Sequence, residues 1–315
     1  MNRYIGARLD ERFATRDRRG KSKAVIDLAL DSFLKEVKGT TGDGKNVQRL
    51  DPEFKQAAIS NMKTFVFAGH DTTSSTISYV YYYLSKNPKC LERIRAEHDA
   101  VFGTDISTVS SQLKNDARLL NQLEYTLAVT REVLRLQPPA STIRIGEPGF
   151  FLHDPVTGDP VPTEGFLIWP LDVGLHRNSK YWPDPSAFIP ERHLANGIPD
   201  GLAGKDSREA WVAFSKGPRN CIGQELALIE TKVILAMTIR SFDFTPAYNE
   251  LSKLKGDGSG YTCDEKGVQT QFGEEAYQIQ LGYVYGSLLQ HDINADLHTR
   301  AALQRAEKAC HAESS

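Results

Sequence analysis

The sequence has almost no excess of either charge: 38 Lys and Arg residues stand against 40 Asp and Glu residues, a formal net charge of −2. Without a concentrated basic face, this composition argues against nucleic-acid binding. No apolar run reaches the roughly 18 residues that crossing a bilayer requires. The arginine-rich amino terminus contains no apolar stretch, which argues against a secretory signal. Four cysteines without C-x-x-C spacing do not imply disulfides.

What the chain does contain is the composition of an ordinary globular protein. Of its 315 residues, 40% are hydrophobic and 25% are charged, which is enough apolar material for a large buried core. Normal apolar content together with a small net charge argues against intrinsic disorder. The length fits one large domain or two average ones, and composition does not choose between them.

Helical patterns dominate the first part of the chain. Residues 22–36 carry an apolar stripe, and a Gly- and Thr-rich loop is expected over 39–45. The Asp-Pro pair at 51–52 predicts a helix start. No stop signal follows before the Asn-Pro pair at 87–88, so the expected helix is on the order of 50 Å long.

Two further helices are expected before the middle of the chain. One runs over residues 88–102 and ends at Gly103. The next begins at Asn121, which has the spacing of a capping box with Glu124, and ends before Pro138.

After this point the pattern changes to short β-like runs. The expected strands are 142–145, 149–152 and 165–169, with weaker signals at 242–245, 268–272 and 276–281. Residues 178–193 are rich in turns, an amphipathic helix follows Gly223, and a polar stretch at 294–311 is compatible with a helix. The expected fold class is therefore mostly α, an α+β domain with a long central helix and small β-sheets.

The residues that most clearly suggest a catalytic or cofactor-binding role lie in 214–223, whose sequence is FSKGPRNCIG. Cys221 directly precedes an amphipathic helix, and both the helix dipole and Arg219 would favour its thiolate form. Gly217 and Gly223 would let the backbone turn tightly and approach a flat ligand closely. A lone thiolate is a poor zinc site but a suitable axial ligand of haem iron. The alternative is a buried structural cysteine.

These residues match F-x-x-G-x-R-x-C-x-G at every fixed position, and the chain resembles the cytochrome P450 family of haem-thiolate monooxygenases. The resemblance implies that Cys221 ligates the haem iron, that Phe214 shields the sulfur, and that Arg219 pairs with a haem propionate. The implied cofactor is haem b. By its position just after a helix, Arg144 is a second candidate propionate partner.

A second motif, A-G-x-D-T-T at residues 68–73, lies within the long expected helix. Glycine inside a helix costs roughly 0.5–1 kcal/mol relative to alanine, and a groove for a small molecule would explain Gly69. Asp71 and Thr72 offer an acid and an alcohol suited to delivering protons to iron-bound dioxygen. The alternative is a buried polar kink, but the full match to the family's motif favours the functional interpretation.

A third motif is E-x-x-R, formed by Glu132 and Arg135 on one helix face. The alternative is an ordinary surface ion pair, which contributes little. By resemblance, Arg192 joins these two residues in a buried ion network that holds the cysteine segment in place, which is a structural role. His176 and His193 are assigned to no metal.

The resemblance extends to about residue 281, and family members are much longer at the amino end. We therefore expect a partial P450 domain over 1–282, without the anchor helix or the roof of the substrate pocket, and an atypical polar tail over 283–315. A full-length relative would reside in the endoplasmic reticulum membrane, whereas this chain without an anchor would be cytoplasmic or peripheral. The motifs are closest in style to filamentous-fungal enzymes of secondary metabolism.

By resemblance, the expected function is monooxygenation of an apolar organic substrate by O2, with electrons from NADPH–cytochrome P450 reductase. The intact Asp71–Thr72 pair favours this reaction over peroxide rearrangement on the same scaffold, which needs no reductase. A third hypothesis is a non-catalytic remnant, because a pocket without its roof exposes much apolar surface.

Overall fold

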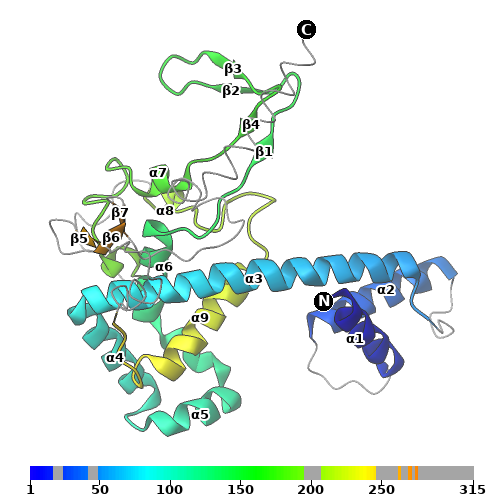
Figure 1. Ribbon diagram of the computed structural model, residues 1–315, viewed down its shortest axis with the longest axis horizontal. Coiled ribbons are helices and arrows are strands. Elements are labelled where there is room, and N and C mark those ends of the chain that lie inside the picture. Colours follow the sequence, from blue (N-terminus) through cyan, green and yellow to red (C-terminus); the bar gives the residue numbers. More distant parts are fainter. Residues whose placement is uncertain are drawn as a thin grey trace. The chain divides into compact units, whose positions relative to one another are not determined.

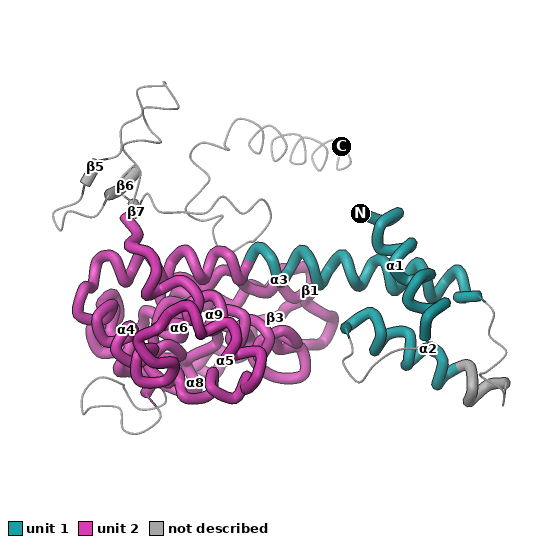
Figure 2. Tube along the Cα trace, turned by 90° about the horizontal axis from the view of Figure 1, so that it is seen from below, with its two compact units in different colours: residues 1–71 teal, residues 72–315 magenta. Residues whose placement is uncertain are grey.

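The computed structural model describes residues 1–16, 24–41, 49–194 and 207–245, together with three short strands between residues 262 and 275. Helices dominate these residues and the strands form small sheets, which confirms the expected mostly α class (Figure 1). The chain divides into two compact units, Met1–Asp71 and Thr72–Ser315, which Figure 2 shows in different colours.

The first unit contains α1 (Asn2–Ala14), α2 (Val25–Thr41) and the beginning of α3 (Pro52–Lys86). α2 begins later than the sequence pattern suggests, and it continues through the first residues of the loop expected at 39–45. The boundary between the two units falls within α3.

The sequence pattern does not predict α1, because its few apolar residues are interspersed with many arginines. Ile5, Leu9 and Phe13 recur at every fourth residue and are buried on one helix face. The core of the first unit consists of Ile5, Leu9, Phe13, Leu30, Phe33, Leu50, Ala58 and Ile59.

α3 has the start and the extent that the sequence predicts. Asp51 Oδ2 accepts a hydrogen bond from the backbone N–H of Phe54 at 2.9 Å, and Pro52 occupies the first turn, where a missing N–H costs no helical bond. At 35 residues, α3 is about 50 Å long. The next helix, α4 (Pro88–Phe102), ends at Gly103, whose φ of 75° favours glycine.

The core of the second unit lies between the later part of α3 and the helices α4, α6 (Glu124–Leu136) and α9 (Gln224–Thr238). The buried cluster consists of Val80, Tyr82, Tyr83, Leu84, Ile94, Tyr125, Val129, Val133, Leu136, Leu235 and Ile239. A smaller helix, α5 (Val109–Asn115), contacts α9.

The start of α6 differs from the expectation. The predicted capping box between Asn121 and Glu124 is wrong, because the chain forms a 3₁₀ turn over Ala117–Gln122 and α6 begins only at Glu124. The residue at the N-cap is Leu123, which contributes no side-chain hydrogen bond.

A carboxylate from another helix takes over the capping role. Glu97 of α4 accepts hydrogen bonds from the backbone N–H of Tyr125 at 2.5 Å and of Thr126 at 2.9 Å. An acceptor with negative charge at a helix N-terminus satisfies free amides and interacts favourably with the helix dipole. A contact between residues so far apart in sequence has no local signal.

Short antiparallel strands occur where the three stronger β-like runs lie. β1 (Arg144–Ile145) pairs with β4 (Leu167–Ile168), and β2 (Phe151–His153) pairs with β3 (Pro160–Pro162). The runs at 142–145, 149–152 and 165–169 are therefore confirmed. The sequence pattern does not predict β3, because its two prolines argue against a strand.

The later strand signals have mixed outcomes. No strand forms at 242–245, whereas the run at 268–272 contains β6 (Gln269–Gln271). β6 pairs with β5 (Thr262–Cys263) and with β7 (Glu274–Glu275). The stretches 276–281 and 294–311 lie outside the described residues.

Two short helices flank the turn-rich segment at 178–193. They are α7 (Asp172–His176) and α8 (Ser207–Ala210), and the sequence pattern predicts neither. The segment itself consists mainly of turns, as expected, and ends in a 3₁₀ turn at Pro190–His193.

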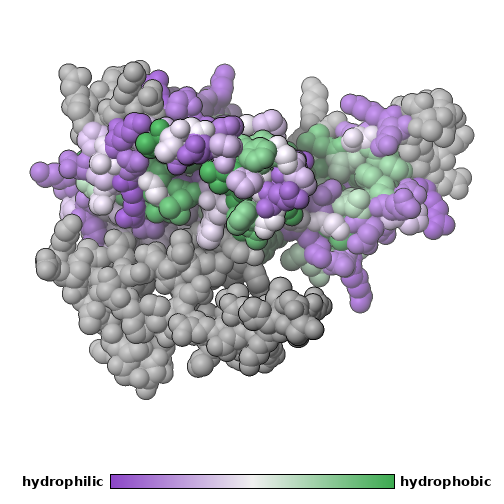
Figure 3. All heavy atoms as spheres, turned by 90° about the horizontal axis from the view of Figure 1, so that it is seen from above, coloured by the Kyte–Doolittle hydropathy of each residue, from purple (hydrophilic) through white to green (hydrophobic). Residues whose placement is uncertain are grey.

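Exposed apolar side chains are intermixed with polar ones on the face shown in Figure 3. On α3, the side chains of Phe65, Val66 and Phe67 are 44–55% exposed. Among the residues that the structure describes, no helix combines the length and the apolar character needed to cross a membrane.

Substitution of Glu97 by alanine is expected to lower the free energy of unfolding by about 1–2 kcal/mol, because two amides of α6 lose their acceptor. Asn121→Ala is the matched control and is expected to change it by less than about 0.5 kcal/mol. Urea unfolding followed by circular dichroism measures both values. A larger loss in the Asn121 variant would show that the cap is assigned to the wrong residue.

Candidate active site

A cavity in the second unit brings together several of the residues that the sequence motifs identify. Thr72, Phe214, Arg219 and Cys221 all line it. The open volume among the lining residues is about 750 Å³, including the space at its mouth.

Residues 212–223, here called the cysteine loop, are held largely by their own backbone. The N–H of Ser215 donates to the carbonyl of Val212 at 2.7 Å, and the N–H of Cys221 donates to the carbonyl of Phe214 at 2.9 Å. α9 begins directly after the loop. Cys221 is exposed and forms no disulfide, so its sulfur can serve as a ligand.

The two glycines of the cysteine loop have different roles. Gly217 has a φ of 79°, which side chains other than glycine's rarely adopt. Gly223 has a φ of −90°, and a Cβ added there would meet the Cys221 sulfur at 3.8 Å, an ordinary contact. The left-handed turn therefore depends on Gly217. The chain also turns at Gly223, where the N–H of Gln224 donates to the carbonyl of Cys221 at 3.4 Å, but with a φ that other residues can adopt.

α3 contributes a wall rich in hydroxyl groups. Thr72, Thr73 and Thr76 line the cavity, and Oγ1 of Thr76 donates to the carbonyl of Thr72 at 2.9 Å. Thr130 of α6 and Thr231 of α9 also line the cavity. The cavity thus combines hydroxyl groups with the cation of Arg219, the thiol of Cys221 and the carboxyl group of Asp172.

The other residues of the A-G-x-D-T-T motif lie before the boundary between the two units. Gly69 and Asp71 belong to the first unit. Gly69 is exposed, and a Cβ added there would meet no atom within 4 Å. Asp71 Oδ1 lies 3.1 Å from Nδ1 of the neighbouring His70.

Arg144 does not line the cavity. It is exposed on β1, and its Nη1 donates to the carbonyl of Ile143 at 3.1 Å. Since Arg144 is not among the lining residues, the structure brings Arg219 but not Arg144 to the cavity that contains Cys221. A propionate contact by Arg144 stays a prediction.

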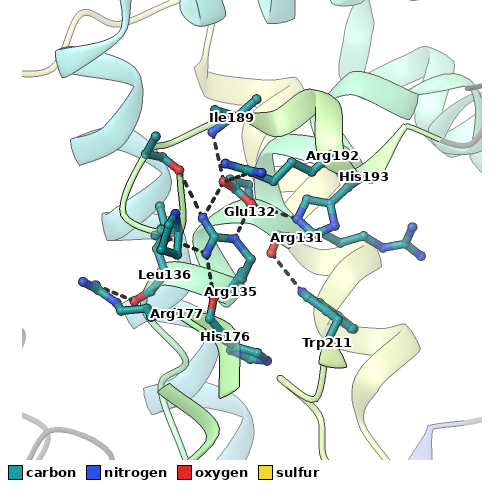
Figure 4. Close-up of polar contacts among 12 residues, drawn as sticks. Arg131, Glu132, Arg135, Leu136, His176, Arg177, Ile189, Arg192, His193 and Trp211 are labelled. Carbon is teal, nitrogen blue, oxygen red and sulfur yellow. Dashed lines mark hydrogen bonds and ion pairs between the residues drawn. The ribbon is translucent and has the colours of Figure 1, made fainter. Parts of the chain in front are cut away.

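Glu132 is the centre of a buried polar network, shown in Figure 4. Its two oxygens accept hydrogen bonds from Nε and Nη2 of Arg135, both at 2.8 Å, in a bidentate pair. Nε of Arg192 lies 3.5 Å from Oε1, and Nε2 of His193 lies 2.9 Å from Oε2. The backbone N–H of Ile189 also donates to Oε1 at 2.9 Å. The structure thus brings the E-x-x-R pair and the predicted third residue together.

Arg135 uses all five of its N–H donors. Two donate to Glu132, and three donate to the carbonyls of His176, Pro185 and Ala187 at 2.7, 2.7 and 3.1 Å. These carbonyls belong to α7 and to the turn-rich segment, so a single guanidinium group ties both to α6.

The groups around Glu132 stabilise its ionised form. Burial by itself would raise the pKa of Glu132, but the hydrogen bonds and charges of Arg135 and His193 outweigh it and lower the pKa to about 2. Burial lowers the pKa of His193 despite the neighbouring carboxylate. Near neutral pH, the ring of His193 is therefore neutral and donates through Nε2 to an ionised Glu132.

Sequence reasoning misses the contacts of two histidines. His193 contacts Glu132 across 61 residues, and Nε2 of His176 accepts the N–H of Val212 across 36 residues at 2.9 Å. Spacing carries no signal for contacts so distant. Only the position of His193 directly after Arg192 pointed to the network.

The cavity residues fit a flat, largely apolar and anionic cofactor such as haem. Cys221 offers a sulfur ligand, Arg219 a cation for an acidic group, and Phe214 an apolar ring. In the part of the chain that the structure describes, no three His, Cys, Asp or Glu side chains gather as a metal site. A metal ion bound by Cys221 would therefore need its other ligands from a cofactor that contains the metal. A porphyrin supplies four such nitrogen ligands.

Comparison with known proteins gives matches over most of the chain. The family model for Cytochrome P450 matches residues 2–272. Cytochrome P450 monooxygenase polC of Polytolypa hystricis is 40% identical over 282 residues, which cover 90% of this chain and 48% of the relative. Cytochrome P450 monooxygenase acrF of Aspergillus aculeatus is 36% identical over 293 residues, which cover 89% of this chain and 56% of the relative.

A third relative is a self-sufficient cytochrome P450 monooxygenase of Exserohilum turcicum. It is 32% identical over 250 residues, which cover 77% of this chain and 21% of the relative. This chain thus spans about half the length of the two relatives from Polytolypa hystricis and Aspergillus aculeatus.

Glu132→Gln keeps the shape of the side chain but leaves Arg135 and Arg192 without a buried counter-charge. The substitution is expected to lower the free energy of unfolding by about 3–5 kcal/mol. Glu124→Gln, at an exposed position of the same helix, is the control and is expected to cost less than about 0.5 kcal/mol. Urea titration measures both, and similar values for the two variants would contradict an energetic role of the network.

The stability difference between the wild type and Glu132→Gln is expected to depend on pH. Unfolded Glu132 takes up a proton near its ordinary pKa of 4.5, whereas the folded residue stays ionised down to about 2. Because the folded pKa is depressed, the stabilisation is complete above about pH 5 and is lost as the pH falls from about 4.5 to 2. Unfolding titrations at about pH 7 and about pH 3 should show the difference shrink at the lower pH, and a difference that grows would rule out an ionised Glu132.

Proposed function

Because the chain belongs to the cytochrome P450 family, we propose that it forms the haem-binding part of a monooxygenase. The reaction inserts one atom of O2 into an apolar organic substrate and reduces the other to water, in the setting of secondary metabolism. One observation carries the proposal: Cys221, Arg219 and Phe214 from one motif line the same cavity as Thr72 from another. The names of the fungal relatives as monooxygenases support it.

The proposed cofactor is haem b, held by the cysteine loop. Cys221 supplies the axial sulfur ligand, Arg219 pairs with a propionate, and Phe214 covers the sulfur. Gly217 supports this site through its left-handed backbone, and Gly223 does so as the N-cap of α9. Gly69 and Arg144 are assigned to the same site from the motif and from position alone.

When bound, a thiolate-ligated haem supplies the activation of dioxygen. The residues of the chain prepare the site for that chemistry. Cys221 lies just before the N-terminus of α9, where the helix dipole favours negative charge on the sulfur. Thr72 donates a proton from its hydroxyl oxygen at the cavity wall, and the preceding residue, Asp71, resupplies that proton.

Three other threonine hydroxyl groups in the cavity form hydrogen bonds with the backbone. Those of Thr76, Thr130 and Thr231 donate to carbonyls one turn back in their own helices at 2.8–2.9 Å. This pattern is common for threonine inside helices. We assign proton delivery to Thr72 because it belongs to the A-G-x-D-T-T motif and lines the cavity.

The remaining wall of the cavity suits an apolar substrate. Leu134, Pro139, Ala140, Ala213 and Leu228 line it, and burial of apolar surface against such side chains is favourable.

Electrons for the reaction come from NADPH–cytochrome P450 reductase. We further propose that residues 1–282 form a partial P450 domain and that 283–315 form an atypical polar tail. A full-length relative would reside at the endoplasmic reticulum membrane.

The haem assignment is tested by reducing the protein, adding CO and recording the absorption spectrum. The wild type is expected to show the red-shifted Soret band of a thiolate-ligated haem, and Cys221→Ala is expected to lose it. Cys90→Ala, which removes the half-buried cysteine of α4, is the matched control and keeps the band. A folded protein that takes up no haem would be a non-catalytic remnant, and the proposal would fail.

The role of Thr72 is tested by turnover with NADPH and the reductase. Thr72→Ala is expected to slow product formation about a hundredfold, because it removes the proton donor. Thr64→Ala, at an exposed position of the same helix, is the control and should turn over at the wild-type rate. Rearrangement of a hydroperoxide without reductase, at equal rates in both variants, would instead indicate a peroxide isomerase.

A further inference from the structure

The buried residue His176 connects the polar network to the cysteine loop. It is the last residue of α7, and none of its surface is exposed. Its carbonyl accepts a hydrogen bond from Nη1 of Arg135 at 2.7 Å, as Figure 4 shows. Its ring Nε2 accepts a hydrogen bond from the backbone N–H of Val212 at 2.9 Å. One residue therefore contacts both the network and the first residue of the loop.

The hydrogen bond from Val212 determines the chemical state of the ring. A backbone N–H can only donate, so Nε2 is the acceptor and the neutral ring carries its proton on Nδ1. Burial and the nearby charge of Arg135 lower the pKa of His176 to about 4, which keeps the ring neutral near physiological pH. The ring is thus a permanent acceptor under the conditions in which the protein works.

Backbone hydrogen bonds carry this restraint from Val212 to the sulfur. The carbonyl of Val212 accepts the N–H of Ser215 at 2.7 Å, and the carbonyl of Phe214 accepts the N–H of Cys221 at 2.9 Å. Both bonds belong to the turn that directs Cys221. If the Val212 amide lost its partner, the fixed end of that turn would be released.

We propose that His176 is a positioning residue for Cys221: it holds the Val212 end of the cysteine loop, so that the sulfur keeps one direction at the cavity wall. The inference rests on the proposed function, because it takes the sulfur of Cys221 to be the haem ligand. His176 is not among the residues that line the cavity, and it acts through the loop backbone.

Two substitutions separate the hydrogen bond from the bulk of the ring. His176→Phe keeps a flat ring without an acceptor, whereas His176→Gln places an amide oxygen near the position of Nε2. Amide hydrogen exchange without haem should be about tenfold faster at Val212 and Cys221 in the phenylalanine variant and close to wild type in the glutamine variant. Equal exchange in the wild type and in His176→Phe would overturn the proposal, whether or not the chain binds haem.

The second measurement is the spectrum of the reduced, CO-bound, haem-loaded protein. His176→Phe should lose part of the thiolate-type Soret band, and His176→Gln should restore it. An unchanged band in His176→Phe would overturn the proposal and leave the proposed function intact. A wild type without that band would overturn the proposed function, and amide exchange would then decide the role of His176.

His98→Phe is the matched control. His98 is also fully buried, but its Nε2 contacts Thr126 Oγ1 at 2.8 Å, and none of the contacts that the structure describes for it involves the cysteine loop. The substitution should destabilise the protein without changing exchange at Val212 or the Soret band. The same changes in both phenylalanine variants would mean a general packing effect, and the proposal would fail. If His176→Phe does not fold, His176→Asn, whose amide is too short to reach Val212, replaces it.

Discussion

Burying the carboxylate of Glu132 costs several kcal/mol unless its charge is compensated, and the bidentate pair with Arg135 provides that compensation within α6 itself. Once this pair exists, Arg135 still has three donors, and they hold α7 and the turn-rich segment by their carbonyls. Arg192 and His193 complete the network from the far end of that segment. The arrangement of the second unit around α6 therefore depends on one satisfied buried charge.

The same network reaches the chemistry of the site through backbone contacts. Arg135 holds the carbonyl of His176, the ring of His176 holds the amide of Val212, and the cysteine loop follows from there. None of the charged groups needs to touch a ligand for this effect. A structural ion network and a ligand loop are thus parts of one hydrogen-bonded assembly, with Cys221 at its open end.

Features with local causes could be predicted from the sequence. The start of α3 follows from Asp51 and Pro52, the end of α4 from Gly103, and the residue types of the cysteine loop from their fixed spacing. Features that depend on distant partners could not be predicted. The sequence around α6 does not predict that Glu97 caps it, because Glu97 belongs to another helix. The local pattern instead points to Asn121, which does not cap α6.

The site shows the same division between local and distant causes. The motifs identify Cys221 and Thr72, but only the fold shows that both line one cavity and that Arg144 is not among its lining residues. The most direct test of the central claim, that Cys221 at this cavity is an iron ligand, is X-ray absorption at the iron edge of the haem-loaded protein. The expected result is one sulfur neighbour of iron in the wild type and none in Cys221→Ala. An iron with only nitrogen and oxygen neighbours in the wild type would contradict it.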